Sequence, residues 1–119
     1  MDHDEVRQAT RGIQRRVVIE TPEARFTLYT LEPGRRTPWH FHSEVADWYI
    51  CQEGELTVMT HAPNSSVTLQ AGGMTTVPAG TVHTTINASE RRCRFALFQG
   101  PGTYDFKTVE VPDRSSDTS

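Results

Sequence analysis

The stretch Trp39–Gly54 reads WHFHSEVADWYICQEG, and it places His40 and His42 two residues apart, with Asp47 five residues further on. Side chains two residues apart in a β-strand point to the same face of the sheet. We therefore expect His40 and His42 to face one side together. Imidazole nitrogens combined with a carboxylate oxygen are common ligands of transition metals. A protein of this size also carries some histidines by chance, so the rest of the chain has to decide whether this stretch is a metal site.

The residues after Asp47 indicate how this strand lies in the fold. On a strand that begins at Asp47, Tyr49 and Cys51 share the face of Asp47, whereas Trp48 and Ile50 face the other way. Both faces are apolar. This is expected of a strand in a closed barrel whose outer surface is also covered.

Short β-type segments separated by turn residues run through most of the chain. They are rich in Val, Thr, Phe, Tyr and Ile, and pairs such as Pro33-Gly34 and Gly72-Gly73 interrupt them. The only candidate helix is Asp4–Gly12. So many short strands in one small domain predict an all-β sandwich or barrel. The predicted strands are Arg16–Glu20, Arg25–Leu31, Thr37–Phe41, Asp47–Gln52, Glu55–His61, Ser66–Gln70, Met74–Val77, Thr81–Asn87, Arg92–Gln99 and Asp105–Val111.

Two motifs with regular spacing surround the candidate ligands. The first, from Gly34 to Gly54, reads G-x5-H-x-H-x4-D-x6-G, and the second, from Gly72 to Asn87, reads G-x5-P-x-G-x2-H-x3-N. In this order and spacing they resemble the two signature motifs of the cupin superfamily, and the chain is similar to its compact single-domain members. The resemblance implies a cupin double-stranded β-helix, or jelly-roll barrel, of about ten short antiparallel strands. Its glycines and proline have a purely structural interpretation as turn residues.

The resemblance also implies one divalent transition metal per chain, bound inside the barrel. Carried over position by position, the ligands are His40, His42, Asp47 and His83. Such a set suits Zn, Fe, Mn, Ni, Co or Cu and leaves coordination positions open for water or substrate. The usual carboxylate of the family is Glu, and Asp47 is one methylene shorter. Two roles therefore stay open for Asp47: a direct ligand, or a general acid or base beside the metal.

Further site residues follow from the same alternation. Tyr49 is expected to line the barrel, where its hydroxyl either binds substrate or packs, and with Asp47 it is the candidate catalytic residue. Cys51 is expected to point inward as a buried thiol rather than a reactive one. Arg94 alternates with Phe95 and, if it points inward, is a hook for a carboxylate substrate. The candidate substrate pocket therefore consists of Tyr49, Cys51, Arg94 and Phe95.

A metal with open positions acts as a Lewis acid on a carbonyl or enolate oxygen. The preferred hypothesis is a metal-dependent enzyme that isomerises, cyclises or cleaves a small oxygenated metabolite without redox chemistry. Small cupins that resemble this chain include sugar-acid-converting proteins and polyketide cyclases. Two alternatives stay open, an iron-dependent dioxygenase and a non-catalytic cupin that binds a small molecule or assists a larger enzyme.

Length and composition limit the remaining choices. With 119 residues, the chain suits one domain, which we place at residues 17–111, between a partly ordered N-terminal arm (1–16) and a disordered C-terminal tail (112–119). A net charge of −3 argues against nucleic acid as a partner. The sequence shows neither a membrane-spanning stretch nor a secretory signal, so we expect a cytoplasmic protein whose Cys51 and Cys93 are free thiols.

The resemblance finally implies a subunit contact. By alternation, Trp39, Phe41 and Trp48 lie on the face opposite the ligands, where they either cover a sheet face or contact a second subunit. Small cupins are often homodimers, so a homodimer is the expected state.

Overall fold

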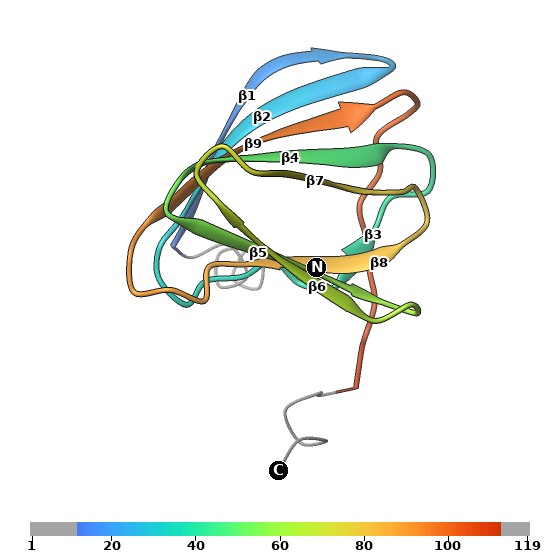
Figure 1. Cartoon of the computed structure of the whole chain (residues 1–119). Helices are drawn as coiled ribbons and strands as arrows, with labels where there is room; N and C mark the ends of the chain where they lie inside the picture. The colour runs from blue at the N-terminus through green and yellow to red at the C-terminus, as the bar shows by residue number, and fades with distance from the viewer. Residues whose placement is uncertain (1–11, 113–119) are drawn as a thin grey trace.

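The computed structural model describes residues 12–112, which form two five-stranded antiparallel sheets and no helix (Figure 1). Sheet A has the order β1-β2-β9-β4-β7, and sheet B has the order β10-β3-β8-β5-β6. The prediction of a jelly roll of about ten short antiparallel strands is confirmed, although the sheets face each other as a sandwich and are not joined into a closed ring. The strands are β1 (Ile13–Thr21), β2 (Ala24–Leu31), β3 (His40–Phe41), β4 (Ala46–Glu53), β5 (Glu55–His61), β6 (Ser65–Gln70), β7 (Met74–Val77), β8 (Val82–Ile86), β9 (Cys93–Gly100) and β10 (Lys107–Thr108).

The first strand begins earlier than its sequence pattern indicates. β1 starts at Ile13, so residues 13–16, which we assigned to the N-terminal arm, pair with β2 in sheet A. β1 is an edge strand, exposed on nearly all of its length, and its polar residues therefore hide the usual alternation. The expected helix over Asp4–Gly12 lies outside the described residues except for Gly12, as does the tail after residue 112.

Two strands are shorter than expected. β3 contains only His40 and Phe41, because Pro38 lacks the N–H group that a sheet ladder needs. Thr37 still donates its backbone N–H to the carbonyl of Thr85, at 2.9 Å. β10 contains only Lys107–Thr108, which pairs with β3.

The space between the two sheets has an apolar end and a polar end. Cys51 pairs with Phe95 and Cys93 with Leu31 at the apolar end. Both cysteines are free and Cys51 is buried, as predicted, and Cys93 is buried as well. Further along the same strands, Asp47 pairs with Gln99 at the polar end. The strand alternation thus builds a packed core and a polar site within one sandwich.

Two of the motif residues hold the turns that frame this interior. Gly54, between β4 and β5, has a φ of 76°, and a Cβ there would lie 2.4 Å from the carbonyl oxygen of Arg92. Only glycine fits this position. Asn87 is fully buried, and its amide donates to the carbonyls of Leu31 (3.0 Å) and Arg91 (2.7 Å), so it ties the end of β8 to the end of β2. These contacts confirm the structural interpretation of the motif glycine and explain the asparagine.

The outer face of sheet A corrects one expectation. Trp48 and Ile50 in β4 are 43% and 38% exposed, so the outside of this sheet is not covered within the described part of the chain. Phe98 pairs with Trp48, and Met74 pairs with Ile50. We call the exposed side chains of this face the outer apolar patch; they are Ile19, Trp48, Ile50, Met74 and Phe98.

Candidate metal centre

Three histidines from sheet B meet at the polar end of the interior. His40 in β3 pairs directly with His83 in β8, and their ring centroids lie 4.3 Å apart. His42 follows β3, and its ring centroid lies 5.0 Å from that of His40. All three side chains are buried, with at most 4% of each residue exposed. The predicted shared face of His40 and His42 therefore exists, although His42 lies just beyond the end of the short strand.

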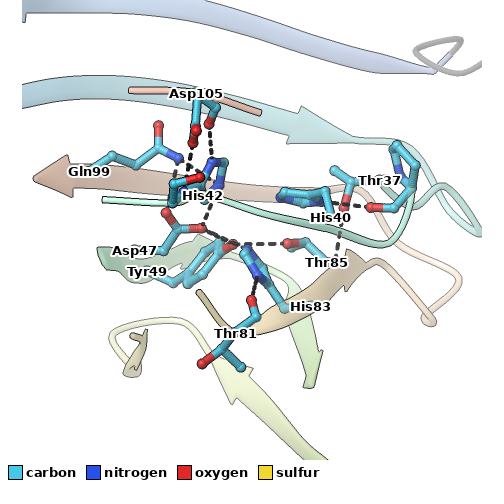
Figure 2. Close-up of polar contacts among 12 residues, drawn as sticks. Thr37, His40, His42, Asp47, Tyr49, Thr81, His83, Thr85, Gln99 and Asp105 are labelled. Atoms are coloured by element: carbon cyan, nitrogen blue, oxygen red, sulfur yellow. Dashed lines mark hydrogen bonds and ion pairs between the residues drawn. The ribbon is translucent and has the colours of Figure 1, made fainter. Parts of the chain in front are cut away.

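Backbone carbonyls orient each imidazole ring. The Nδ1 atoms of His40, His42 and His83 lie 2.7, 2.5 and 2.8 Å from the carbonyl oxygens of Pro38, Asp105 and Thr81, respectively (Figure 2). A carbonyl oxygen only accepts hydrogen bonds, so each Nδ1 carries the hydrogen. In the neutral ring, Nε2 then keeps its lone pair, which is the state a metal ligand requires.

Asp47 brings a carboxylate from sheet A to these rings. Its Oδ2 atom lies 2.9 Å from Nε2 of His83 and 3.5 Å from Nε2 of His42. Tyr49 donates its hydroxyl to the same oxygen at 2.8 Å, and the amide of Gln99 donates to Oδ1 at 3.0 Å. Asp47 is only 1% exposed, so its charge depends on these neighbours.

The donor set fits a divalent cation. One ligand atom from each of His40, His42, Asp47 and His83 lies within 4.8 Å of the others. An unprotonated Nε2 and a carboxylate oxygen at 2.9 Å repel each other unless a proton or a cation lies between them. Three imidazoles and one carboxylate match the hardness and geometry of the first-row transition metals. These four residues could therefore hold such an ion.

The members of the cluster differ in the direction in which their surroundings shift their pKa values. Burial lowers the pKa of His40 to about 3, and the neighbouring His83 acts in the same direction. Burial by itself would raise the pKa of Asp47, but hydrogen bonds from His42 and His83 outweigh it and hold this pKa below its usual value. Burial would lower the pKa of His42, yet its contact with Asp47 raises it. The ionised carboxylate attracts a positive charge, either a proton or a cation.

The segment between β9 and β10, residues 101–106, covers the cluster. The sequence patterns did not predict this role. The ring of Phe106 stacks on His40 with a centroid distance of 4.3 Å, and the ring of Tyr104 lies 5.4 Å from that of His42. Asp105 accepts from the backbone N–H of Ser43 at 2.7 Å. In Figure 1 this orange-red segment runs from the upper sheet to the lower sheet beside β3. No spacing rule identifies these residues, because they follow the second motif by more than fifteen positions.

Gln99 is a second functional candidate that the sequence pattern did not reveal. Its amide nitrogen lies 3.2 Å from Nε2 of His42, in addition to its bond with Asp47. The sequence does contain a pattern that could have identified Gln99: it alternates with Phe95 and Leu97, which places it on the inner face of β9.

A small cavity of about 30 Å³ reaches the cluster, enough for roughly one water molecule. Of the predicted pocket residues, Tyr49 and Phe95 line it. Cys51 does not, because it lies in the apolar end, where its thiol points to the carbonyl of Gly54 at 3.5 Å. The other residues that line the cavity are Tyr29, Thr37, His40, His42, Thr85, Leu97, Gln99, Tyr104 and Phe106.

Arg94 does not line the cavity either, which corrects the expectation of an inward anion hook. Its side chain is 54% exposed and lies 4.0 Å from the carboxylate of Glu53. Phe95 occupies the inward position, so alternation turns Arg94 outward. Arg94 instead lines a larger hollow of about 310 Å³ that none of the four ligand residues reaches.

Comparison with known proteins identifies the class of this fold and site. The sequence model of the cupin domain family matches residues 27–98, and the chain therefore belongs to the cupin family. That stretch contains all four candidate ligands. No curated protein sequence matches the chain.

Solved structures share the fold at low sequence identity. An uncharacterised conserved protein with a double-stranded β-helix domain from Klebsiella pneumoniae is 24% identical, with a TM-score of 0.74 and coverage of 93% of this chain and 96% of that one. The polyketide cyclase RemF from Streptomyces resistomycificus is 19% identical (TM-score 0.72, 87% and 75% covered). An oxalate oxidase is 18% identical (TM-score 0.70), and the match covers 82% of this chain but only 55% of the oxidase.

Within residues 12–112, no helix has the length and hydropathy that crossing a membrane would require.

Proposed function

We propose that this cupin is a metal-dependent enzyme that performs isomerase, cyclase or lyase chemistry on a small oxygenated metabolite. One observation carries the proposal: three buried imidazoles, each anchored at Nδ1 by a backbone carbonyl, present Nε2 towards one carboxylate. Without a proton or a cation between them this arrangement costs free energy, because it gathers lone pairs and a negative charge in a buried site. The fold similarity to a polyketide cyclase supports this class of reaction.

A divalent cation held by His40, His42, Asp47 and His83 would supply Lewis acidity towards a substrate oxygen. We assign Asp47 to the ligand set, because Oδ2 lies within contact of two imidazole nitrogens. Gln99 orients this carboxylate from the opposite side through Oδ1. The four ligand residues are buried, which strengthens each of these interactions.

Tyr49 is the proposed hydrogen-bond donor to the substrate. It lines the cavity, and its hydroxyl donates to Asp47 and accepts from the hydroxyl of Thr85 at 3.2 Å. Burial, and then the charge of Asp47, raise the pKa of Tyr49 well above its ordinary value, so the phenol stays protonated. By turning its hydroxyl from Asp47 to a substrate oxygen that gains negative charge, it would donate a hydrogen bond to that oxygen.

Metal content and uptake test the proposal. Untagged protein purified without chelators is expected to contain about one metal per chain by mass spectrometry, and metal-free protein should bind Co²⁺ with visible d–d absorption. His42→Ala and His83→Ala should lose both signals. His61→Ala should keep them, because His61 lies outside the cluster. A wild-type chain that neither contains nor takes up metal would refute the proposal.

An oxidative reaction is the alternative, and the fold similarity to an oxalate oxidase favours it. The identity of the bound metal and an oxygen electrode separate the two. Iron or manganese with oxygen consumption on addition of a carbon acid supports the oxidative reaction, whereas turnover without oxygen consumption supports the isomerase, cyclase or lyase. Ligand binding without any turnover would indicate a binding protein.

We also propose that the outer apolar patch joins two copies of the chain as a homodimer. Its five side chains are about half exposed, which corresponds to roughly 500 Å² of apolar surface. That is near the upper limit for a monomer, and it suits the centre of an interface of about 800 Å² per partner. Light scattering should find a dimer in the wild type and a monomer in Trp48→Ser/Phe98→Ser. A wild-type monomer at micromolar concentration would contradict the homodimer.

A further inference from the structure

Arg25 in β2 is aligned across sheet A with Asp47 of the metal cluster. It pairs with Gln99 in β9, and Gln99 pairs with Asp47 in β4. Directly paired residues of neighbouring strands point to the same face of a sheet. The side chain of Arg25 therefore enters the interior next to the glutamine that contacts both His42 and Asp47.

The guanidinium of Arg25 is poorly paired for its burial. Its side chain is only 13% exposed, and Nε is buried without a hydrogen-bond partner among the described residues. Its contact with the half-exposed carboxylate of Glu20 is 3.7 Å long, well beyond the distance of a charge-assisted hydrogen bond. A buried donor without an acceptor is unfavourable, and a bound acceptor would remove that cost.

A second polar atom on this face also lacks a partner. Thr27 is fully buried, and its Oγ1 has no hydrogen-bond partner among the described residues. Thr27 pairs with Leu97, and Leu97 pairs with Tyr49; both of these partners line the cavity. Two unsatisfied polar groups thus lie two residues apart on the inner face of β2.

Aromatic rings connect Arg25 to the cavity. Its guanidinium carbon lies 4.2 Å from the centroid of the Tyr104 ring, and Tyr104 lines the cavity beside His42. Burial raises the pKa of Tyr29, another lining residue, and the charges of Arg15 and Arg25 act against that rise. Burial also raises the pKa of Tyr104, and the charges of the same two arginines again oppose the rise. Arg25 therefore places a positive charge behind the aromatic wall of the cavity.

We propose that Arg25 forms a subsite for the carboxylate of a small organic acid whose other oxygen reaches the metal, with the ring of Tyr104, which separates Arg25 from the cavity of about 30 Å³, moving aside to admit it. This assignment rests on the proposed function. A divalent cation with one carboxylate and three neutral imidazoles has a net charge of +1, so the cluster and Arg25 both favour an anionic substrate. A planar guanidinium is the side chain that best matches a carboxylate. Arg25 thus takes the role that the sequence pattern suggested for Arg94.

Calorimetric titration of the zinc-loaded chain tests the subsite. The probes are lactate and succinate, each compared with its neutral amide, lactamide or succinamide. We expect the wild type to bind at least one acid tenfold or more tightly than its amide. Arg25→Gln should raise the Kd for that acid at least tenfold and leave the Kd for the amide unchanged. Arg94→Gln is the matched control and should behave as the wild type.

Arg25→Lys and metal analysis complete the test. Lysine keeps the positive charge but lacks the planar guanidinium, so we expect a Kd for the acid between those of the wild type and Arg25→Gln. If Arg25→Gln does not fold, Arg25→Lys is the variant that tests the subsite. Equal affinity of the wild type for acids and amides, or an unchanged acid Kd in the Arg25 variants, would overturn the subsite. Failure of the wild type to load zinc would instead overturn the proposed function, so the two failures are distinguishable.

Discussion

The inner and outer faces of β4 differ in a way that hydrophobicity does not explain. On the inner face, Asp47, Tyr49 and Cys51 are each 1% exposed. Trp48 and Ile50, which alternate with them on the outer face, are 43% and 38% exposed. A carboxylate of the strand, Asp47, is thus buried, and its largest apolar residue, Trp48, meets solvent. Asp47 is stable inside because its oxygens have partners on both sheets. The comparison shows that polar partners decide which face of this strand turns inward.

The largest expected contrast between the faces is in stability. Phe95→Ala removes a side chain that is 1% exposed and stacks on Tyr29 with a centroid distance of 4.9 Å, so we expect a loss of about 3–5 kcal/mol. Phe98→Ala, three residues along β9, removes a side chain that is 42% exposed and should cost about 1 kcal/mol or less in the isolated subunit. Urea unfolding monitored by circular dichroism measures both. Equal losses would mean that the outer face is as well packed as the core.

The next contrast is in metal affinity. Asp47→Asn keeps the shape of the side chain but removes its charge, so we expect the affinity for Zn²⁺ to fall at least 100-fold, about 2.7 kcal/mol. Trp48→Phe, the adjacent outward residue, should leave the affinity unchanged. Competition with a chromophoric chelator gives both values. A fall of less than tenfold in Asp47→Asn would place Asp47 outside the ligand set and favour its role as an acid or base.

Tyr49→Phe should have a smaller effect on the metal. The change removes the hydroxyl that donates to Asp47 at 2.8 Å, and loss of a partner of a ligand typically lowers metal affinity about tenfold or somewhat more. Ile50→Val, on the outer face, serves as the control. The same chelator competition checks the affinity, and turnover should fall by more than the affinity if Tyr49 also donates a hydrogen bond to the substrate. Equal changes in turnover and affinity would make Tyr49 a positioning residue.

The smallest expected effect is at Thr27. Thr27→Val replaces a buried hydroxyl that lacks a partner with a methyl group of similar size, so stability should stay the same or rise by up to about 1 kcal/mol. Thr30→Val, on the outer side of β2, should change stability by less than about 0.5 kcal/mol. Thermal unfolding of metal-loaded protein without organic acids compares them. A clear loss in Thr27→Val would mean that the hydroxyl stabilises the fold.

Much of the site could be predicted because its ligands are local in the sequence. His40, His42 and Asp47 lie within eight positions, and the motif that contains His83 has its own glycines and proline. The covering residues Tyr104 and Phe106 could not be predicted, because their contact with the histidines depends on how the chain crosses between the sheets after β9.

Arg25 and Arg94 show the same limit for the substrate side. Alternation alone left Arg94 with two orientations. The pairing of β9 with β4 places Phe95 opposite the inward-facing Cys51, so the neighbouring Arg94 faces outward. Arg25 carried no motif, and only its pairing with Gln99 brought it to the cluster. Pairings between strands that are distant in the sequence depend on long-range packing, which a local pattern does not encode.

The sequence by itself predicted an all-β sandwich or barrel, because turn residues and strand alternation act over a few positions. The jelly roll and the four candidate ligands followed from the resemblance of its two motifs to those of the cupin superfamily. Only the tertiary structure decided how His42 is oriented, which residues cover the ligands and which arginine approaches them. The carbonyls of Pro38 and Thr81 orient His40 and His83 from two residues away in the chain, whereas the carbonyl of Asp105 orients His42 from 63 positions away. The contact between His42 and Asp105, and the contact of Asp47 in sheet A with His83 in sheet B, form only when the chain has folded and the two sheets have packed together.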